Sequence, residues 1–200
     1  MLTASNSGFR YRHYLRKGTH IAFGAIALAF KFISPPWHIV LTGTLALISW
    51  LLRPHHPLLL PMARPVELRD GVLWGVRYYF GTMFLVSLVF YGRPEVTVGV
   101  WLVLALGDGF SATVGGPKSP PVPWNRKKKL FGTIACFFGA FLGLFIAYAW
   151  YGIAVVPLVA FQFAAIAASV AVFESIDMPL DDNLVIGVIS SVLILAMGLF

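Results

Sequence analysis

Cysteine and charged residues are scarce in this chain of 200 residues. The single cysteine, Cys136, excludes an intrachain disulfide and a thiol-rich metal cluster. Charged residues make up 12% of the sequence, whereas a soluble globular domain carries about 25%. This shortage of charge excludes an ordinary soluble domain, a solvated coiled coil and a disordered chain.

Apolar residues take the place of the missing charges. They form 58% of the sequence, against roughly 45–50% in a typical soluble domain, and the mean hydropathy is +0.82. These values indicate an all-α, polytopic integral membrane protein. The 15 Lys and Arg residues outnumber the 8 Asp and Glu residues and give a net charge of +7. Basic residues of membrane proteins collect on the cytoplasmic side and contact anionic lipid, so this excess does not require a nucleic acid partner.

Seven apolar segments alternate with polar stretches, and a helix needs about 20 apolar residues to cross the hydrocarbon core. The segments are Ile21–Ile33, Trp37–Leu52, Val72–Phe90, Val96–Leu106, Leu130–Tyr151, Ile153–Phe173 and Leu184–Phe200. The first two are short and are separated by Pro35 and Pro36, so they form either two spans or one re-entrant hairpin. The fourth reaches full length only if its helix continues through Asp108 to about Gly116. We predict about seven transmembrane helices in a single membrane-embedded domain that covers residues 1–200.

Basic residues predict the orientation of this domain. A cytoplasmic N-terminus leaves only Lys31 and Arg93 on the far side of the membrane, while Arg77 falls within a span. The other basic residues then share the cytoplasmic side: Arg10, Arg12, Arg16, Lys17, Arg53, Arg64, Arg69, Lys118, Arg126, Lys127, Lys128 and Lys129. The positive-inside rule therefore predicts a cytoplasmic tail over residues 1–15 and an active site that faces the cytoplasm.

Asp108 directly follows an apolar run, within the sequence Gly107-Asp108-Gly109. A carboxylate near membrane depth is costly and usually marks an ion, substrate or proton site. The flanking glycines allow the backbone to approach a ligand closely. The alternative is an aspartate that ends a helix in the head-group region.

Half of the acidic residues lie in the turn from Glu174 to Asn183. Carboxylates of this kind suit Mg²⁺, which binds through one or two of them together with substrate phosphates. The sequence has no cluster of His and Cys that would suit zinc or iron. We expect Asp108, Glu174, Asp181 and Asp182 to hold Mg²⁺. The alternative is a solvated loop in which Asp182 or Asn183 caps the last helix.

A basic stretch precedes the fifth apolar segment. Asn125 stands before a run of four cations that includes Lys128. Gly132 and Thr133 follow at the predicted helix start, where free backbone N–H groups attract an anion. Together these residues suit the phosphates of a nucleotide. The alternative is that the cations only hold the topology and contact anionic lipid.

Arg16, Lys17 and His20 lie where the first apolar segment begins. Arg16 and His20 are four residues apart, so a helix places them on one face. An arginine and a histidine on one face suit a phosphate group. The alternative is that the long side chains snorkel to the membrane interface.

The carboxylates, the cations and the glycine-containing helix start are all predicted on the cytoplasmic side. Phosphoryl transfer needs such a set, because it is catalysed mainly by positioning and by charge neutralisation. A nucleotide arrives from the cytosol, and apolar helices admit a lipid from the side. The pattern G-x-x-x-x-G-K-[ST] does not occur in the sequence, which excludes the usual P-loop ATPase architecture.

Four short motifs occur in order along the chain. They are Arg16-Lys17-x-x-His20, Gly107-Asp108-Gly109-x-Ser111-Ala112, Pro123-Trp124-Asn125 running into Lys128-x-x-x-Gly132-Thr133, and Glu174 followed by Asp181-Asp182-Asn183-Leu184. With these motifs the chain resembles the polyprenol kinase family of integral membrane enzymes, which includes dolichol kinase and CTP-dependent diacylglycerol kinase. The Pro-Trp-Asn stretch is most similar to the phytol kinase branch. The resemblance implies transfer of a nucleotide γ-phosphate, commonly from CTP, to a lipid alcohol such as phytol or a polyprenol.

The chain also departs from the family pattern. Lys128-Lys129 stands where the family usually has Lys-Ser, and Gly115-Gly116 followed by Pro117 is expected to break the helix after Asp108.

We assign expected roles on this basis. The catalytic residues are expected to be Asp108, Lys128 and Asp182. The nucleotide and its phosphates are expected to contact Arg16, Lys17, His20, Gly107, Gly109, Asn125, Lys128, Gly132 and Thr133. The expected cofactor is Mg²⁺, and the phosphoryl donor is CTP or ATP. The expected partners are this nucleotide, the lipid alcohol and membrane lipids.

Three other functions fit parts of the sequence. A CTP-dependent diacylglycerol kinase differs only in its acceptor. A cytidylyltransferase that forms a CDP-lipid also needs Mg²⁺ and CTP, but the Ser-x-x-Lys-Arg run of CDP-diacylglycerol synthases does not occur here. A small transporter or lipid-binding scaffold would use Asp108 to handle protons or cations. Transporters often contain inverted repeats, and the sequence shows no internal repeat.

Overall fold

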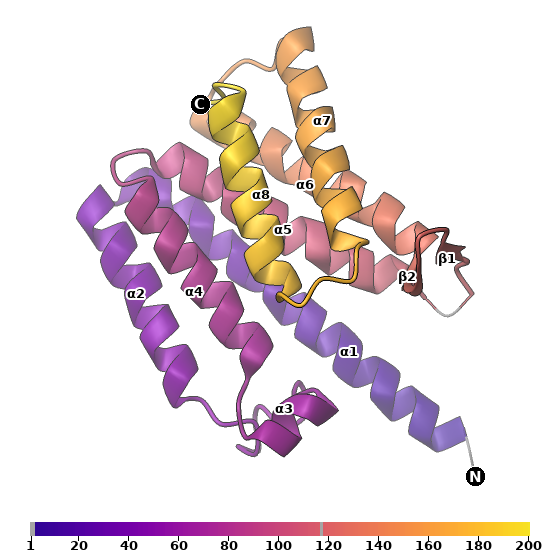
Figure 1. The fold of residues 1–200 in the computed structure, drawn as a ribbon. Helices are drawn as coiled ribbons and strands as arrows, with labels where there is room; N and C mark the ends of the chain where they lie inside the picture. Colours follow the sequence, from indigo (N-terminus) through magenta and orange to yellow (C-terminus); the bar gives the residue numbers. More distant parts are fainter. Residues whose placement is uncertain (1–2, 117) are drawn as a thin grey trace.

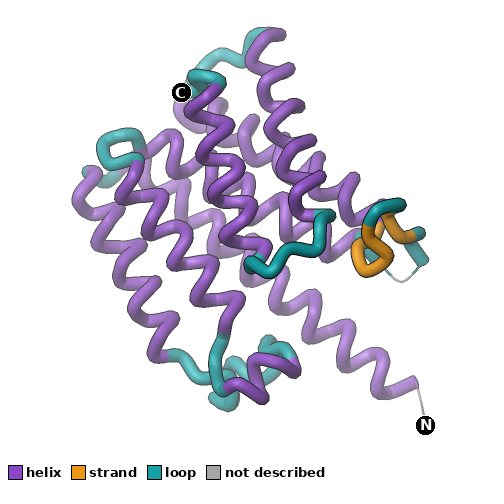
Figure 2. The backbone as a smooth tube through the Cα atoms, viewed as in Figure 1, coloured by secondary structure: helices purple, strands orange, loops and turns teal. Residues whose placement is uncertain are grey.

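The fold consists of packed helices and one short hairpin of strands (Figures 1 and 2). The computed structural model describes residues 3–116 and 118–200. The helices are α1 (Thr3–Gly24), its 3₁₀ continuation η1 (Ala25–Phe32), α2 (Pro35–Leu51), α3 (Pro65–Asp70), α4 (Trp74–Val89), α5 (Pro94–Val114), α6 (Leu130–Tyr151), α7 (Pro157–Glu174) and α8 (Asp182–Ala196). The strands β1 (Pro121–Val122) and β2 (Asn125–Lys129) pair in an antiparallel manner between α5 and α6.

Proline and glycine set several helix boundaries. Proline stands in the first turn of α2, α3, α5 and α7, where its missing N–H group leaves no hydrogen bond unmade. Gly71 ends α3 with φ of 68°, and Gly152 ends α6 with φ of 72°. Both adopt the left-handed conformation that favours glycine at a helix C-terminus.

Each of the seven apolar segments of the sequence forms or contains a helix. Within the described ranges, α5, α6 and α7 are long and apolar enough to cross a membrane, and α8 is apolar but shorter. The helix α5 continues through Asp108 and ends at Val114, as the sequence predicted. Its end falls at Gly115 and Gly116, which confirms the predicted break. The three long apolar helices indicate a membrane protein.

The helix α5 forms the centre of the molecule. In its apolar stretch 78% of the residues are buried, compared with 39% in α6 and 33% in α7. The side chains of Trp101 and Leu104 lie in the core with Leu144 of α6 and Phe163 of α7. The outer helices expose apolar side chains instead, and Phe161 of α7 is 71% exposed. An apolar outer surface around a packed core is what a bilayer requires of a helical protein.

Two glycines of α6 allow it to contact the backbone of α5. A Cβ atom at Gly143 would lie 2.7 Å from the carbonyl carbon of Leu102, and Gly139 lies against the backbone of Leu106 and Gly107. The spacing Gly-x-x-x-Gly predicts such a packing face, and the structure confirms it. This close contact fixes α6 along the helix that carries Asp108.

Candidate functional site

The candidate site begins where α1 crosses the second half of α5. Gly109 of α5 lies so close to α1 that a Cβ atom there would be 2.5 Å from Cγ1 of Ile21. Because Gly109 has no side chain, α1 approaches closely enough for its polar residues to reach Asp108. The sequence predicted that this glycine admits a ligand, and the structure shows it against another helix.

Asp108 forms a buried ion pair with Lys17 of α1. The Nζ atom of Lys17 lies 2.5 Å from Oδ2 of Asp108, and the two side chains are 8% and 10% exposed. The Nε2 atom of His20 lies 3.4 Å from the same oxygen. A carboxylate buried at this depth requires a cation beside it, and Lys17 supplies that charge.

Two aromatic residues hold the backbone of α1 in place beside this pair. The hydroxyl of Tyr79 donates a hydrogen bond to the carbonyl oxygen of His20 at 3.1 Å. The indole N–H of Trp101 in turn donates to the hydroxyl of Tyr79 at 2.7 Å. The position of His20 is therefore set by α4 and α5 together.

A second cluster of charges lies one turn further along α5. Lys128 at the end of β2 donates to Oε1 of Glu174 at 2.8 Å and to Oδ2 of Asp182 at 3.0 Å. The hydroxyl of Ser111 also donates to Oε1 of Glu174, at 3.1 Å. Asp108 and Ser111 are three residues apart on one helix, so they share a face of α5. The two clusters are therefore neighbours along that face.

The hairpin of β1 and β2 positions Lys128 through contacts with the end of α7. The indole N–H of Trp124 donates to the hydroxyl of Ser175 at 2.8 Å, and the amide of Asn125 donates to the carbonyl oxygen of Ser175 at 3.0 Å. Lys127 adds an exposed ion pair with Asp177. Asn125, predicted to contact the nucleotide, fastens the hairpin to the end of α7 in this structure.

The charges of the second cluster change the proton affinity of Lys128. Burial disfavours its charged form, but Glu174 and Asp182 outweigh burial and raise the pKa of Lys128 above its ordinary value. The ammonium group therefore stays charged at neutral pH. It is a fixed cation beside two carboxylates.

The first turn of α8 connects the two clusters. Asp181 caps the helix by accepting from the backbone N–H of Asn183 at 3.0 Å. Burial raises the pKa of the Asp181 carboxyl above its ordinary value. Asp182 then turns to Lys128, while Asn183 lines a cavity on the Asp108 side. The alternative interpretation of this turn expected Asp182 or Asn183 to cap the last helix, and the structure shows that Asp181 caps it.

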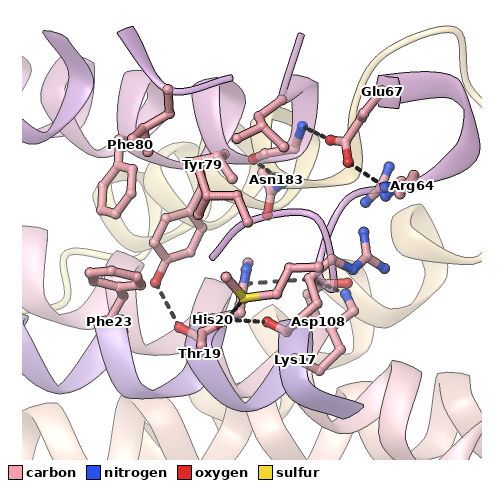
Figure 3. Close-up of a pocket in the computed structure, with 17 residues that line it drawn as sticks. Lys17, Thr19, His20, Phe23, Arg64, Glu67, Tyr79, Phe80, Asp108 and Asn183 are labelled. Carbon is pink, nitrogen blue, oxygen red and sulfur yellow. Dashed lines mark hydrogen bonds and ion pairs between the residues drawn. The ribbon is translucent and has the colours of Figure 1, made fainter. Parts of the chain in front are cut away.

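A cavity of about 290 Å³ lies beside the ion pair of Lys17 and Asp108 (Figure 3). Figure 3 shows the rings of Phe23 and Phe80 at one side of this cavity and Lys17, Asp108 and Arg64 at the opposite side. The other lining residues are Arg16, Thr19, His20, Leu52, Leu59, Met62, Glu67, Leu73, Gly75, Val76, Tyr79 and Asn183. The cavity thus has an apolar part and a charged part.

The charged part of the cavity has features of an anion site. Arg16 and Arg64 both line it. Two guanidinium groups near each other repel, and a bound anion removes that repulsion. The buried atom Asn183 Oδ1 has no hydrogen-bond partner in the structure, and His20 Nε2 has only the carboxylate of Asp108 near it, at 3.4 Å. Unpartnered buried polar atoms at a cavity wall suit a polar ligand.

The loop that carries Arg64 is held by a buried glutamate. Glu67, which is 2% exposed, accepts from the backbone N–H of Arg64 at 2.8 Å and from that of Gly75 at 2.9 Å. These two bonds tie α3 and the preceding loop to the start of α4. Glu67 therefore positions Arg64 at the cavity.

The remaining predicted residues lie at helix contacts. Gly107 is buried, and a Cβ atom there would lie 3.5 Å from Sγ of Cys136. Gly132 faces α5, because a Cβ atom there would lie 2.9 Å from the carbonyl oxygen of Ser111. The hydroxyl of Thr133 donates to the carbonyl oxygen of Lys129, four residues earlier in the chain, at 3.4 Å. In this geometry Gly107 and Gly132 serve helix packing, and the hydroxyl of Thr133 contacts the backbone before its own helix.

The start of α6 offers fewer free N–H groups than the sequence predicted. The N–H group of Leu130 donates to the carbonyl oxygen of Pro120 at 2.9 Å. That of Phe131 donates to the hydroxyl of Ser119, also at 2.9 Å. Two donors that an anion would otherwise use are therefore already occupied.

The expected Mg²⁺ ligands are divided between clusters. Across residues 3–116 and 118–200, no group of three or more His, Cys, Asp or Glu side chains could hold a metal ion. Asp108 pairs with Lys17, while Glu174 and Asp182 pair with Lys128. The side chain of Asp182 is 45% exposed, and one or two carboxylates suffice for Mg²⁺ when phosphates complete its coordination. Glu174 and Asp182 are the two expected ligands that the structure brings together, and both contact Lys128.

Ser111 and Asn183 belong to the motifs of the sequence but had no expected role at the site, and Arg64 belonged to no motif. The signal for Ser111 was its position three residues after Asp108, which places both on one helix face. The sequence analysis counted Arg64 only among the basic residues predicted on the cytoplasmic side. Its place at the cavity depends on Glu67 and on the packing of α3, which no local pattern reveals.

Comparison of the chain with models of protein families, with curated proteins and with solved structures finds no match. The geometry of the two charged clusters and of the cavity must therefore carry the functional argument.

Proposed function

We propose that this protein is an integral membrane kinase that transfers the γ-phosphate of a nucleoside triphosphate, CTP in our first choice, to a lipid alcohol. One observation carries the proposal. A cavity with an apolar part and a cationic part lies beside the ion pair of Lys17 and Asp108, and the cluster of Lys128 lies one helical turn further along α5. A lipid alcohol has an apolar chain and a polar end, and a nucleotide adds phosphates that cations bind.

The acceptor alcohol would occupy the cavity with its hydroxyl beside Asp108. The alcohol oxygen attacks the γ-phosphorus, the new O–P bond forms, and the bond from the γ-phosphorus to the bridging oxygen breaks. The nucleoside diphosphate leaves with that oxygen, and the alcohol proton passes to the carboxylate of Asp108. Two carboxylates line the cavity, and Glu67 is held by the backbone N–H groups of Arg64 and Gly75, so Asp108 is the candidate base.

Cations on both sides of Asp108 would hold the phosphates. Arg16 and Arg64 would bind the transferred group with His20, and Lys128 would bind the remaining phosphates with Asn125 close by. Bound Mg²⁺ would neutralise the charge of those phosphates, and Glu174 and Asp182 are the residues that suit it. Positioning and charge neutralisation supply most of the catalysis of phosphoryl transfer.

The proposed topology has seven membrane helices and a cytoplasmic N-terminus. The helical segments would be α1 with η1, α2, α4, α5, α6, α7 and α8. The distribution of basic residues supports this orientation, because it leaves only Lys31 and Arg93 on the far side. The hairpin of Lys128 and the turn before α8 then share the compartment that contains the nucleotide.

The decisive experiment uses the purified protein in nanodiscs with Mg²⁺ and γ-labelled CTP or ATP. Phytol, farnesol, a long polyprenol and diacylglycerol are offered in parallel. We expect label in one lipid and a nucleoside diphosphate as the second product. The D108N variant should lose the activity, while R69Q, which changes an exposed arginine outside the cavity, should retain it.

Two results would overturn the proposal. Release of pyrophosphate with formation of a CDP-lipid would identify a cytidylyltransferase. No labelled lipid from protein that is folded and monodisperse would favour the transporter or scaffold.

A further inference from the structure

A second hollow lies on the opposite side of α4 from the cavity. It is a groove of about 650 Å³ between α2 and α4, which run side by side in Figure 1. The lining residues are Gly43, Ala46, Leu47, Trp50, Trp74, Arg77, Tyr78, Gly81, Thr82, Phe84, Leu85 and Leu184. We propose that this groove binds one anionic glycerophospholipid, with its phosphate at Arg77 and one acyl chain along α2 and α4. The proposal does not depend on the kinase activity.

Arg77 provides an uncompensated positive charge at one end of the groove. No acidic side chain of the described residues forms an ion pair with it. Its guanidinium lies 4.3 Å from the ring centroid of Trp50 and 5.7 Å from that of Trp74. One of its terminal nitrogens donates to the carbonyl oxygen of Trp50 at 3.1 Å, but the buried Nε atom has no partner. An arginine held in this way is ready to bind a phosphate.

A second unpartnered donor lies deeper in the same groove. Thr82 is 3% exposed, and its buried hydroxyl has no hydrogen-bond partner in the structure. Thr82 follows Arg77 by five residues, which corresponds to about 7.5 Å along a helix and about 140° around it. The two side chains therefore leave α4 on different faces, although both line the groove. The hydroxyl of Thr82 is the donor available to a lipid ester on its side of the groove.

The rest of the groove matches an acyl chain. Trp50, Trp74 and Tyr78 are exposed at the end that contains Arg77. Tryptophan and tyrosine prefer the interface between membrane and water, so this end belongs at the head-group level. From there α4 leads to Leu85, and the antiparallel α2 contributes Leu47, which is 64% exposed. The polar-to-apolar order of the groove is that of a phospholipid.

Gly81 allows a specific test of lipid binding in the groove. It lines the groove, and a Cβ atom there would have no atom within 4 Å. The Cβ atom of a larger side chain therefore meets no clash, the side chain extends into the groove, and leucine is a better helix former than glycine. Gly18 of α1 is also helical with nothing within 4 Å of an added Cβ atom. G18L is thus the matched control for G81L.

The experiment titrates the purified protein in detergent with phosphatidylglycerol or phosphatidylcholine and counts bound lipid by native mass spectrometry. The wild type should bind one phosphatidylglycerol about tenfold more tightly than phosphatidylcholine. R77Q should weaken binding of phosphatidylglycerol about tenfold, since it removes a charge-assisted hydrogen bond. T82V, which keeps the shape of threonine, should weaken both lipids. G81L should abolish binding of both, while G18L and R69Q should behave as the wild type.

Several results would overturn the proposal. One is a wild type without preference for the anionic lipid, and another is undiminished binding of phosphatidylglycerol by R77Q or G81L. Equal loss in R69Q would show that only general charge matters. Displacement of the lipid by millimolar inorganic phosphate would identify a site for free phosphate. A change from dimer to monomer in G81L would show that a second copy of the chain fills the groove.

Discussion

Lys17 and Asp108 are 91 residues apart in the sequence, and they form an ion pair of 2.5 Å inside the helix bundle. The pair joins the first helix to the central one and lies at the wall of the cavity. We therefore expect loss of this ion pair to affect both the stability of the fold and the proposed activity. Different variants separate these two effects.

Replacement of Lys17 by methionine should destabilise the protein strongly. Removal of one partner from a buried ion pair typically costs about 3–5 kcal/mol, because the other charge remains buried without compensation. The double variant K17M/D108L removes both charges and should recover most of the thermal stability, measured in detergent by the midpoint of unfolding. It should have no kinase activity. An unchanged midpoint in K17M would show that the pair does not hold the fold.

Replacement of Gly109 by alanine should separate α1 from α5. The new methyl group would lie 2.5 Å from Cγ1 of Ile21, and overpacking of this kind costs about 1–3 kcal/mol. The second change I21A opens the same space and should restore both stability and activity. G18A is the control, because it adds a methyl group in open space. Equal effects of G109A and G18A on the unfolding midpoint would contradict the close contact.

The ion pairs of Lys128 should make stability depend on alkaline pH. The folded protein raises the pKa of Lys128 above its ordinary value of 10.5. The stabilisation is therefore complete below the unfolded pKa and disappears as the pH rises through the folded pKa. K128Q should unfold at a lower temperature than the wild type at neutral pH, and the difference should shrink as the pH rises beyond about 10.5. A constant difference between pH 7 and pH 11 would rule out this linkage.

The contact of Trp124 with Ser175 should matter for binding of the nucleotide. W124F removes the donor of a 2.8 Å hydrogen bond that fixes the hairpin of Lys128. We expect a loss of about 1 kcal/mol in stability and a rise in the KM for CTP that exceeds the fall in kcat. W150F is the matched control, since it removes a 2.9 Å bond to Leu28 far from this hairpin. It should lose similar stability without a change in the KM for CTP.

The sequence predicted the helices well because apolar length and proline position are local signals. It predicted that α5 continues through Asp108, and the structure confirms this. The partner of Asp108 was not predictable in the same way. Lys17 and Lys128 are both cations near a membrane boundary, and only the path of α1 across Gly109 decides which one reaches Asp108.

The glycines show the limit of motif reasoning most clearly. Gly107, Gly109 and Gly132 were expected to admit a ligand, and each lies against a neighbouring helix. A missing side chain allows close approach by either kind of neighbour. The glycines of the sequence indicate positions of close approach, but only the fold shows whether a ligand or a neighbouring helix approaches there.

The first turn of α8 gives the site an order of assembly. Asp182 completes the cluster of Lys128, and Asn183 completes the wall of the cavity. Both residues follow every other member of the site along the chain. Lys17, Asp108, Lys128 and Glu174 all precede α8 in the sequence. The proposed site would therefore be complete only once α8 has packed against the helices that precede it.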